Sequence, residues 1–348
     1  MDFNYFNTRH RVPDFAVTLT KNKISITEKL SDRLISLELT DNRGFEADTV
    51  TISLSDHDGK IAFPKRGEKI NIDLGWKGEK LTNKGIYIVD EISYQGSPDV
   101  LTIRAKSVDL MATLGSGKER SFHGKTIGEI VETIAKENQL TPIVSVEFKN
   151  EVIPHIDQNA ESTTNFLSRI ASEHDAIATI KADKLLFIRA GDATTATGKP
   201  LPTIVINRSS GDSFHFTLAE NQNFDRVVAY YHDFSTGKRG SVKEDRKKDK
   251  KDKGINSDST KVKTLRHTYK SKQAAKKAVK RALSKVERGT ANLSITLAEG
   301  NAEIFPEIPI KAKGFKKEID DTDWIVKNVR HSINGNGFTT ALELEVKI

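Results

Sequence analysis

The chain has 348 residues, of which 36% are hydrophobic and 30% charged, and a net charge of +7. It is long enough for two or three small domains. It contains no cysteine, which excludes disulfides, thiolate chemistry and cysteine-ligated metals. No apolar run approaches the roughly 20 residues of a membrane-spanning helix, and the first residues lack the apolar core of a signal peptide. We therefore expect a soluble chain that assembles in a reducing cytoplasm and has no membrane partner.

Residues 1–117 are dominated by period-two alternation, which is typical of strands with one buried face. The clearest runs are residues 50–54, 70–76 and 101–105, and turn sequences such as DHDG and GWKG separate the strands. We predict a first antiparallel β domain, either a barrel or a sandwich.

The spacing of apolar residues becomes helical within residues 118–192. Residues 126–140 place their apolar side chains on one face, and Thr126 with Glu129 forms a capping-box pair at the start. A second helix is predicted at 162–174 and a β-hairpin at 176–189. We predict a small α+β module that ends in a linker rich in glycine, threonine and proline.

Strand patterns return in residues 193–348, which we predict to be a second β domain. The charged segment 241–263 contains KEDRKKDKKDK, with seven bases and four acids. A mixed-sign run of this kind is typical of a solvated, mobile loop. A helix is predicted at 271–288 with Gly289 at its end, and NGNG at 334–337 is expected to turn the last two strands into a hairpin.

Two segments of the sequence resemble each other. Residues 70–105 and 308–345 share the order of a strand, a Gly-aromatic-Lys turn, a second strand and a hairpin strand. The matching pairs are Trp76 with Phe315, Tyr87 with Trp324, and Val89 with Val326. Any two three-stranded meanders look partly alike, but the shared order favours duplication of one β unit. A trimer of a duplicated chain would present six similar units to a sixfold partner.

The sequence offers no convincing site for phosphate or metal. GSGK at 115–118 resembles part of a phosphate loop, but Ala112 and Glu119 occupy the positions where that motif needs glycine and Ser or Thr. We interpret it as a turn at a domain boundary. The nine histidines form no HxxxH or HExxH pair, so we predict neither a metal site nor a cofactor.

The segment 155–176, HIDQNAESTTNFLSRIASEHDA, contains the side chains of which hydrolases build catalytic sets. On a helix, however, Ser168 and His174 lie about 120° apart around the axis and cannot bond to each other. Ser162 is interpreted as an N-cap and His174 as the end of an apolar stripe. We predict no catalytic residue here.

Four stretches resemble one protein family. They are RSFHGKTIGEIVETIA (120–135), IDQNAESTTNFLSRIASEHDAIATIKADKLLFI (156–188), VVAYYHDFSTGK (227–238) and LAEGNAEIFPEIPIKAKGFKKEIDDTDWIVKNVRHSINGNGFTTALELE (297–345). Their order and spacing are similar to those of the late control protein D family of contractile-tailed phages, relatives of the hub part of VgrG spike proteins in type VI secretion. The first 110 residues match the family in pattern more than in distinctive motifs.

The resemblance implies a mainly β fold with two tube-like antiparallel β-barrel domains, formed by a duplicated unit, and a small helix-containing module. It implies a structural baseplate hub of the virion tail, assembled in the host cytoplasm, without enzymatic activity. The hub would be a homotrimer with pseudo-sixfold symmetry that joins a trimeric tail spike to the hexameric tail tube. Tape measure and other baseplate proteins are further expected partners. The last hub strand ends at Ile348, so we expect the spike to be a separate protein. Aromatic residues of the family pattern that are candidate interface positions are Trp76, Phe166, Phe315 and Trp324.

Two other functions remain open at this point. A tail-associated cell-wall hydrolase would draw on the acidic and histidine residues of 155–176, against the helix geometry. A nucleic-acid-binding protein would draw on the net charge of +7, although the sequence has no RNA-binding aromatic motif, helix-turn-helix or zinc finger.

Overall fold

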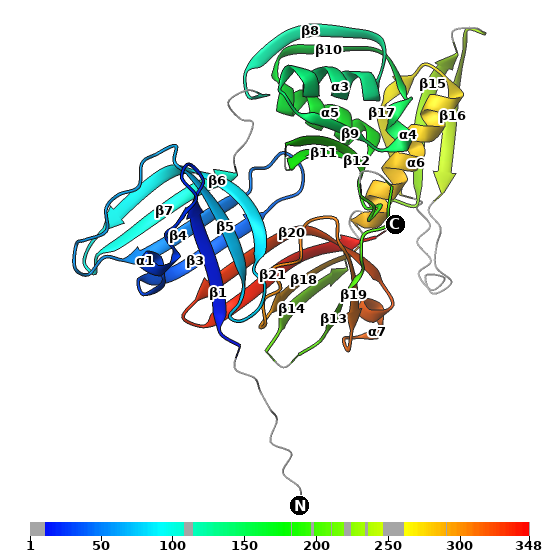
Figure 1. Cartoon of the computed structure of the whole chain (residues 1–348). Helices are drawn as coiled ribbons and strands as arrows, with labels where there is room; N and C mark the ends of the chain where they lie inside the picture. The colour runs from blue at the N-terminus through cyan, green and yellow to red at the C-terminus, as the bar shows by residue number, and fades with distance from the viewer. Residues whose placement is uncertain are drawn as a thin grey trace, which may run out of the picture.

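The computed structural model describes residues 11–107, 114–181, 183–195, 198–209, 211–218, 224–233, 236–245, 261–289 and 291–347. Two β units lie side by side in the lower half of Figure 1, and an α+β module and a helix-backed sheet lie above them. Residue 112 of the rejected phosphate-loop motif is outside the described residues. In the described parts of the chain, no helix is long and apolar enough to cross a membrane.

The first β unit is a curled antiparallel sheet in the order β1-β5-β6-β7-β4-β3. Its alternating strands point Leu37, Ile52 and Leu74 into a closed core, where each is fully buried. The elements are β1 (Pro13–Leu19), β2 (Ile24–Ser25), α1 (Thr27–Ser31), β3 (Leu34–Asp41), β4 (Thr49–Ser55), β5 (Lys69–Trp76), β6 (Thr82–Gln95) and β7 (Val100–Ser107).

The second β unit has the order β13-β19-β20-β21-β18-β14. Its own core is built around Leu293, Ile310 and Trp324. The elements are β13 (Ile204–Asn207), β14 (Ser213–Leu218), β18 (Ala291–Leu297), β19 (Pro309–Lys313), α7 (Lys317–Asp320), β20 (Asp323–Asn334) and β21 (Gly337–Val346). The hairpin predicted at 334–337 is present, since Asn334 pairs with Gly337.

The two units have the same strand order when their strands are matched in chain order, so the sequence duplication is confirmed in the fold. Even a local irregularity is repeated. The pairing of β6 with β7 shifts between Val89 and Glu91, and that of β20 with β21 shifts between Val326 and Asn328. Such bulges re-aim a strand and are specific features of a fold. One difference is that β1 pairs with β5 antiparallel, whereas β13 pairs with β19 parallel.

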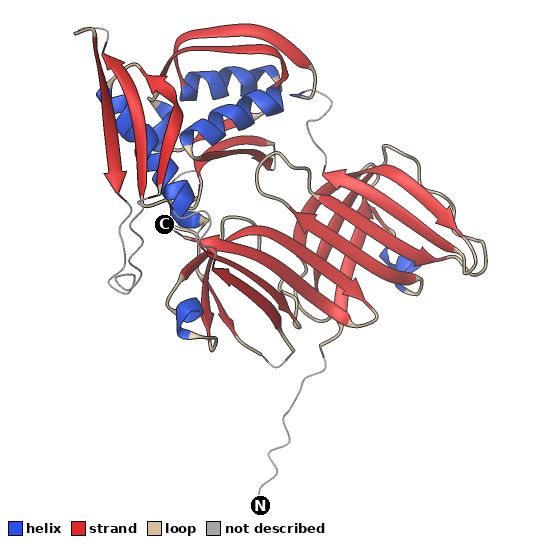
Figure 2. Cartoon of the chain, turned by 180° about the vertical axis from the view of Figure 1, so that it is seen from behind, coloured by secondary structure: helices blue, strands red, loops and turns tan. Residues whose placement is uncertain are grey.

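The mainly β fold class is confirmed, and among the described residues the strands of both units belong to one sheet. They share one 13-stranded sheet, because β3 of the first unit pairs with β20 of the second. Figure 2 shows this sheet running without interruption from one unit into the other.

The α+β module places two helices between a long two-stranded ribbon and a three-stranded sheet (Figure 2). Both predicted helix starts are confirmed: Thr126 and Glu129 form the capping box, and the Ser162 side chain accepts a hydrogen bond from Asn165 N. The elements are β8 (Gly117–Thr126), α3 (Ile127–Glu137), β9 (Thr141–Val144), α4 (Val146–Lys149), β10 (Val152–Ser162), α5 (Thr163–His174), β11 (Ala176–Lys181) and β12 (Lys184–Arg189).

A sheet with its own core is inserted between β14 and β18. The strands, in the order β16-β15-β17, pack Val227 and Ala229 against Ala275 and Val279 of the long helix α6. The sequence predicts this segment to be part of the second β domain, but in the described part of the chain its strands pair with each other and not with the strands of that unit. The elements are β15 (Arg226–Asp233), β16 (Lys238–Asp245), β17 (Val262–Tyr269) and α6 (Lys272–Arg288). The predicted loop 241–263 thus begins within β16 and ends within β17. Residues 246–260 lie outside the described residues.

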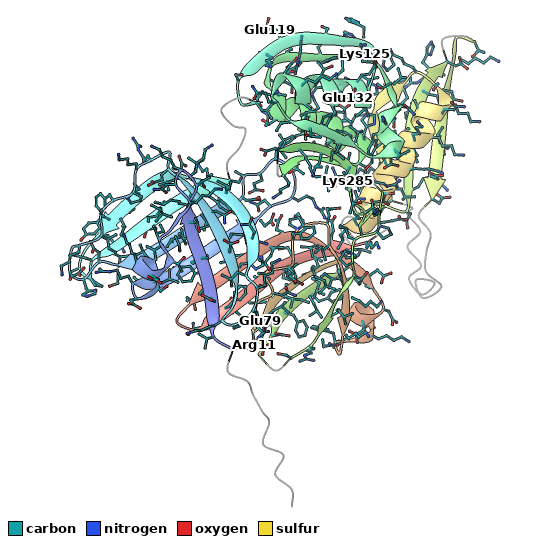
Figure 3. All side chains as sticks on the ribbon, in the orientation of Figure 1. Arg11, Glu79, Glu119, Lys125, Glu132 and Lys285 are labelled. Atoms are coloured by element: carbon teal, nitrogen blue, oxygen red, sulfur yellow. The ribbon has the colours of Figure 1, made fainter. Side chains whose placement is uncertain are left out.

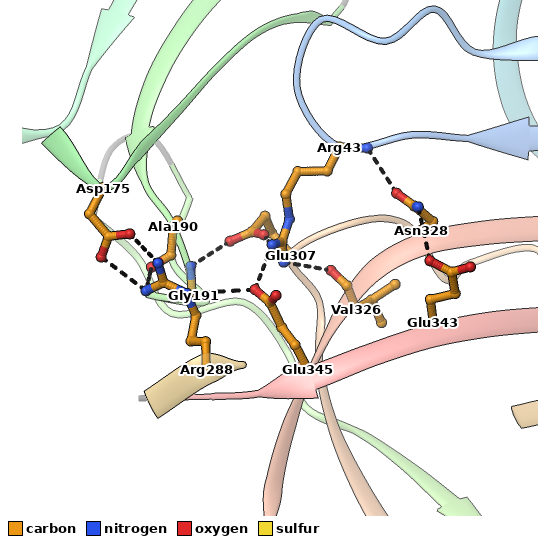
Figure 4. A network of polar contacts seen from close by, with 10 residues as sticks. All are labelled: Arg43, Asp175, Ala190, Gly191, Arg288, Glu307, Val326, Asn328, Glu343 and Glu345. Carbon is orange, nitrogen blue, oxygen red and sulfur yellow. Dashed lines mark hydrogen bonds and ion pairs between the residues drawn. The ribbon is translucent and has the colours of Figure 1, made fainter. Parts of the chain in front are cut away.

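Buried charged side chains join these parts of the molecule (Figure 4). Arg288, the last residue of α6, pairs with Asp175 after α5 (Nη1 to Oδ2, 3.0 Å) and lies 3.7 Å from a carboxylate oxygen of Glu345 in β21. Arg43, after β3, contacts Glu345 at 2.5 Å and Glu307 at 2.6 Å. Burial raises the pKa of Glu307, and the Arg43 charge opposes this shift. The network therefore connects the α+β module, the inserted sheet with α6, and both β units.

Candidate functional site: two open strand edges and a polar sheet face

The joint between the two β units is a strand pairing with an apolar contact behind it. Strand β3 pairs antiparallel with the C-terminal half of β20, where Leu37 faces Ile333 and Leu39 faces His331. Ile333 and Phe338 enter the core of the first unit. The joint thus combines backbone hydrogen bonds with buried apolar surface.

Two side chains of the first unit also bind a loop of the second. The Trp76 indole Nε1 donates to Gly300 O at 3.0 Å, and its ring lies 5.3 Å from that of Phe338. Lys84 Nζ donates to Ala302 O at 3.2 Å. Burial lowers the pKa of Lys84, while the charge of Asp41 opposes that shift. These bonds fix the angle between the units.

Because of the duplication, each joint strand has an equivalent in the other unit. Strand β14 is the second unit's equivalent of β3. It pairs with β18 on one side and, in the described part of the chain, has no strand on the other.

Strand β6 is the first unit's equivalent of β20, and its pairing on one side stops early. On the side of β5, the last bonds are Val89 N to Glu68 O (2.9 Å) and Gly67 N to Val89 O (2.8 Å). The same two bonds occur in the second unit, from Val326 N to Ile308 O and from Glu307 N to Val326 O. Beyond Val326, β3 continues the sheet. Beyond Val89, residues 90–95 have no partner on that side among the residues described.

Apolar side chains are exposed at both open edges. Leu218, at the end of β14, is 67% exposed. At the β6 edge, Tyr94 is 43% exposed and lies 5.5 Å from Phe63, which is 58% exposed. An open edge with exposed apolar groups is a template for pairing with another chain. Phe63-Pro64 recurs as Phe305-Pro306 in the loop before β19. This repeated dipeptide is a sequence signal that the duplication includes the segment beside the open β6 edge.

The face of the large sheet that turns away from the cores carries small hydroxyl side chains across both units. Ser53 and Thr102 are cross-strand neighbours with their oxygens 3.5 Å apart. The outward positions of the paired strands include Ser36, Thr40, Thr49, Thr51, Ser93, Ser294, Thr296, Ser332 and Thr339. The curved sheet therefore presents a continuous polar surface.

The four aromatic residues proposed as interface positions lie mainly in the cores. Phe166 and Trp324 are fully buried, and Trp76 is 8% exposed. Phe315 is partly buried against the second core and packs edge-to-face on Phe214 of β14, at 5.0 Å. A contact of these residues with another chain stays a prediction.

The segment 155–176 does not assemble a nucleophile and its base. The Asp157 carboxylate lies between the Ser121 hydroxyl (2.6 Å) and His155 Nε2 (3.0 Å). A base that activates a serine must contact the hydroxyl itself. His174 Nδ1 instead lies 3.5 Å from a Glu151 carboxylate oxygen. Sequence reasoning missed Ser121 and the strand pairing that brings it here, since the two strands are separated by α3, β9 and α4.

The sequence and the fold both have relatives. Residues 45–337 match the family model described as phage tail baseplate hub (GPD). The chain is 43% identical over 362 residues to a probable baseplate hub protein of Escherichia phage 186, covering 96% of this chain and 93% of that protein. It is 39% identical over 364 residues to the corresponding protein of Escherichia phage P2, covering 97% and 94%.

Solved structures show the same fold at low sequence identity. The 43 kDa tail protein of prophage MuSo2 from Shewanella oneidensis superimposes with a TM-score of 0.66 at 13% identity, covering 95% of this chain and 98% of that one. The Francisella PdpA–VgrG complex contains a chain with a TM-score of 0.51 at 11% identity, covering 97% of this chain and 58% of that one.

Proposed function

Because the chain belongs to the phage tail baseplate hub (GPD) family, we propose that three copies form a ring of six β units that joins a trimeric spike to the hexameric tail tube. Members of this family are structural components of the virion tail baseplate. In this role the chain acts as a structural component of the hub, without a catalytic step.

One observation carries the proposal: within the described residues, the chain contains one complete joint and the two unpaired halves of a second. Within the chain, β3 docks beside the C-terminal half of β20. The equivalents are β14, at one end of the strand order, and residues 90–95 of β6, which extend beyond the pairing with β5. If β14 of one chain docks beside β6 of the next, every unit makes a similar joint with both neighbours. This is a head-to-tail contact, which forms a ring when its rotation closes.

Three chains supply six units, so threefold symmetry in chains becomes approximate sixfold symmetry in β units. The units are similar in strand order but differ at the β1–β5 and β13–β19 pairs. A ring of this kind can contact a sixfold partner with one set of surfaces and a threefold partner with another. The hexameric tail tube and trimeric spike are the proposed partners on these two sides. Tape measure and other baseplate proteins are further candidates.

The polar sheet face would line the bore of the ring. Hydroxyl side chains such as Thr51 and Ser332 stand on this face of the described strands, and their polar groups would offer little apolar surface to a chain passing through the bore. The opposite face of each sheet is already occupied by its core. The curvature of the sheet and the position of the cores on its other face both support an orientation in which the polar face lines the bore.

Light scattering coupled to size-exclusion chromatography tests the proposal on the tag-free chain, alone and with the spike coexpressed. We expect the mass of three chains, and ring-shaped particles with threefold symmetry in electron micrographs. A stable monomer in both samples contradicts the ring.

A further inference from the structure

Two histidines face each other on the outer surface of the β8–β10 ribbon. His123 and His155 are directly paired across the two strands, and their Nδ1 atoms lie 3.0 Å apart. The inner face of the ribbon covers the core of the α+β module, as the buried Ile153 and Ile156 show. Strand β8, on which Glu119 and Lys125 are labelled in Figure 3, lies at the outer boundary of the molecule, away from both open sheet edges.

A carboxylate orients one of the two rings. His155 Nε2 lies 3.0 Å from Asp157 Oδ2, and the Ser121 hydroxyl donates to Asp157 Oδ1 at 2.6 Å. When the Asp157 carboxylate accepts a hydrogen bond from Nε2–H of neutral His155, Nδ1 of that ring carries a lone pair on the side of His123.

We propose that His123 and His155 bind a divalent transition-metal ion between their Nδ1 atoms, with Asp157 as a positioning residue. Metal-binding histidines commonly donate their second N–H to a carboxylate, as His155 does here. His123 provides the second lone pair when its proton is on Nε2. The site is separate from the hub function proposed above.

The distance between the two nitrogens indicates which metals fit. With metal–nitrogen bonds of about 2.0–2.1 Å, a separation of 3.0 Å between the nitrogens gives an angle of roughly 90° at the metal. Neighbouring positions of a square-planar or octahedral sphere meet at this angle, which favours Ni²⁺ or Cu²⁺ over tetrahedral Zn²⁺. Within the described residues, no three His, Asp or Glu side chains converge on a metal position. Water would therefore complete the sphere.

Without metal, a proton on Nδ1 of His123 that is donated to Nδ1 of His155 would hold the rings at this distance. When the metal binds, that proton moves to Nε2 of His123, so a neutral pair releases no net proton. Binding weakens as the pH falls, because protonation of either imidazole removes the lone pair that the metal needs.

The experiment measures Ni²⁺ binding to the tag-free full-length chain by calorimetry and Cu²⁺ binding by electron paramagnetic resonance. Wild type should bind one ion per chain with a signal from two nitrogens. We expect His123→Asn and His155→Asn each to abolish this ion, and Asp157→Asn to weaken it about 10–100-fold. His57→Asn is the matched control, since His57 is exposed in a turn of the first unit, and it should leave binding unchanged.

Circular dichroism separates loss of the site from loss of fold. A folded His123→Asn chain that keeps the ion with the same two-nitrogen signal overturns the proposal, as does wild type that binds no ion at neutral pH.

Discussion

Val89 and Val326 occupy the same place in the two β units. Each donates its N–H to the segment before the preceding strand, and each precedes a shift in strand register. Beyond Val326 the sheet is continued by β3, whereas beyond Val89 no described strand continues it on that side. This difference between two otherwise equivalent positions supports the proposal that a second chain docks there.

Charges on the open edges should prevent assembly. Tyr94→Lys on β6 and Leu218→Lys on β14 would each bury a charge without a partner when two edges meet. We expect either change to weaken association of the chains by roughly tenfold or more, measured by light scattering over a concentration series. Val146→Lys is the control, because Val146 is exposed on α4 of the α+β module, and it should leave the trimer intact. Trimers of unchanged affinity in both edge variants would show that the chains meet elsewhere.

The pair of Arg288 and Asp175 should be essential for stability. Both side chains are 7% exposed, so Arg288→Met would leave the Asp175 carboxylate buried without its partner. We expect a loss of about 3–5 kcal/mol in the free energy of unfolding, measured by chemical denaturation. The exposed pair of Arg189 with Glu147, at 3.1 Å, provides the comparison, and Arg189→Met should cost less than about 1 kcal/mol. An equal loss of unfolding free energy in both variants would contradict the expectation that the buried pair contributes more than the exposed one.

Glu151 should make the contact between the α+β module and α6 sensitive to acid. Burial alone would raise its pKa, but hydrogen bonds from His174 and Arg281, with their charges, lower it from 4.5 to about 2. A lowered pKa in the folded state adds stability that is complete above the pKa of the unfolded chain and is lost as the pH falls to about 2.

The difference in melting temperature between wild type and Glu151→Gln, followed from pH 7 to pH 2, measures this contribution. The wild-type advantage should be constant above about pH 5 and shrink steadily below it. An advantage that stays constant down to pH 2 would contradict the assignment.

Trp324 should act within its own unit and not between chains. Its indole Nε1 donates to Ile319 O at 2.9 Å and so fixes α7 on the core. Trp324→Phe removes this bond, and we expect a loss of about 1–3 kcal/mol in the free energy of unfolding with an unchanged trimer mass. Phe305→Leu, at an exposed aromatic of the same unit, should shift stability by less than about 0.5 kcal/mol. Dissociation of the Trp324→Phe trimer without loss of stability would instead place this residue at an interface.

Local features were predictable from the sequence because their hydrogen bonds close within a few residues. The capping box of Thr126 and Glu129, the Ser162 cap and the turn after Asn334 are all of this kind. The duplication was also readable, since it repeats a sequence order and not only a periodicity.

Pairings between distant strands were not predictable in the same way. The apolar pattern predicts that β15 is a strand, but not that Arg226 pairs with Val262 of β17 in a sheet of its own. The pairing of His123 with His155 and of β3 with β20 likewise depends on which strands become neighbours. Which strands become neighbours depends on how whole units pack together, and a short window of sequence does not contain that information.

The joint between β3 and β20 lies within one polypeptide, and this changes how the proposed ring would respond to chain concentration. Six separate units would have to meet in five association steps, and the yield of rings would follow the sixth power of the free concentration. Three chains need only two such steps, because the linked halves hold each other at a high effective concentration. The yield then follows the third power, so rings would form at a lower chain concentration than six separate units would need.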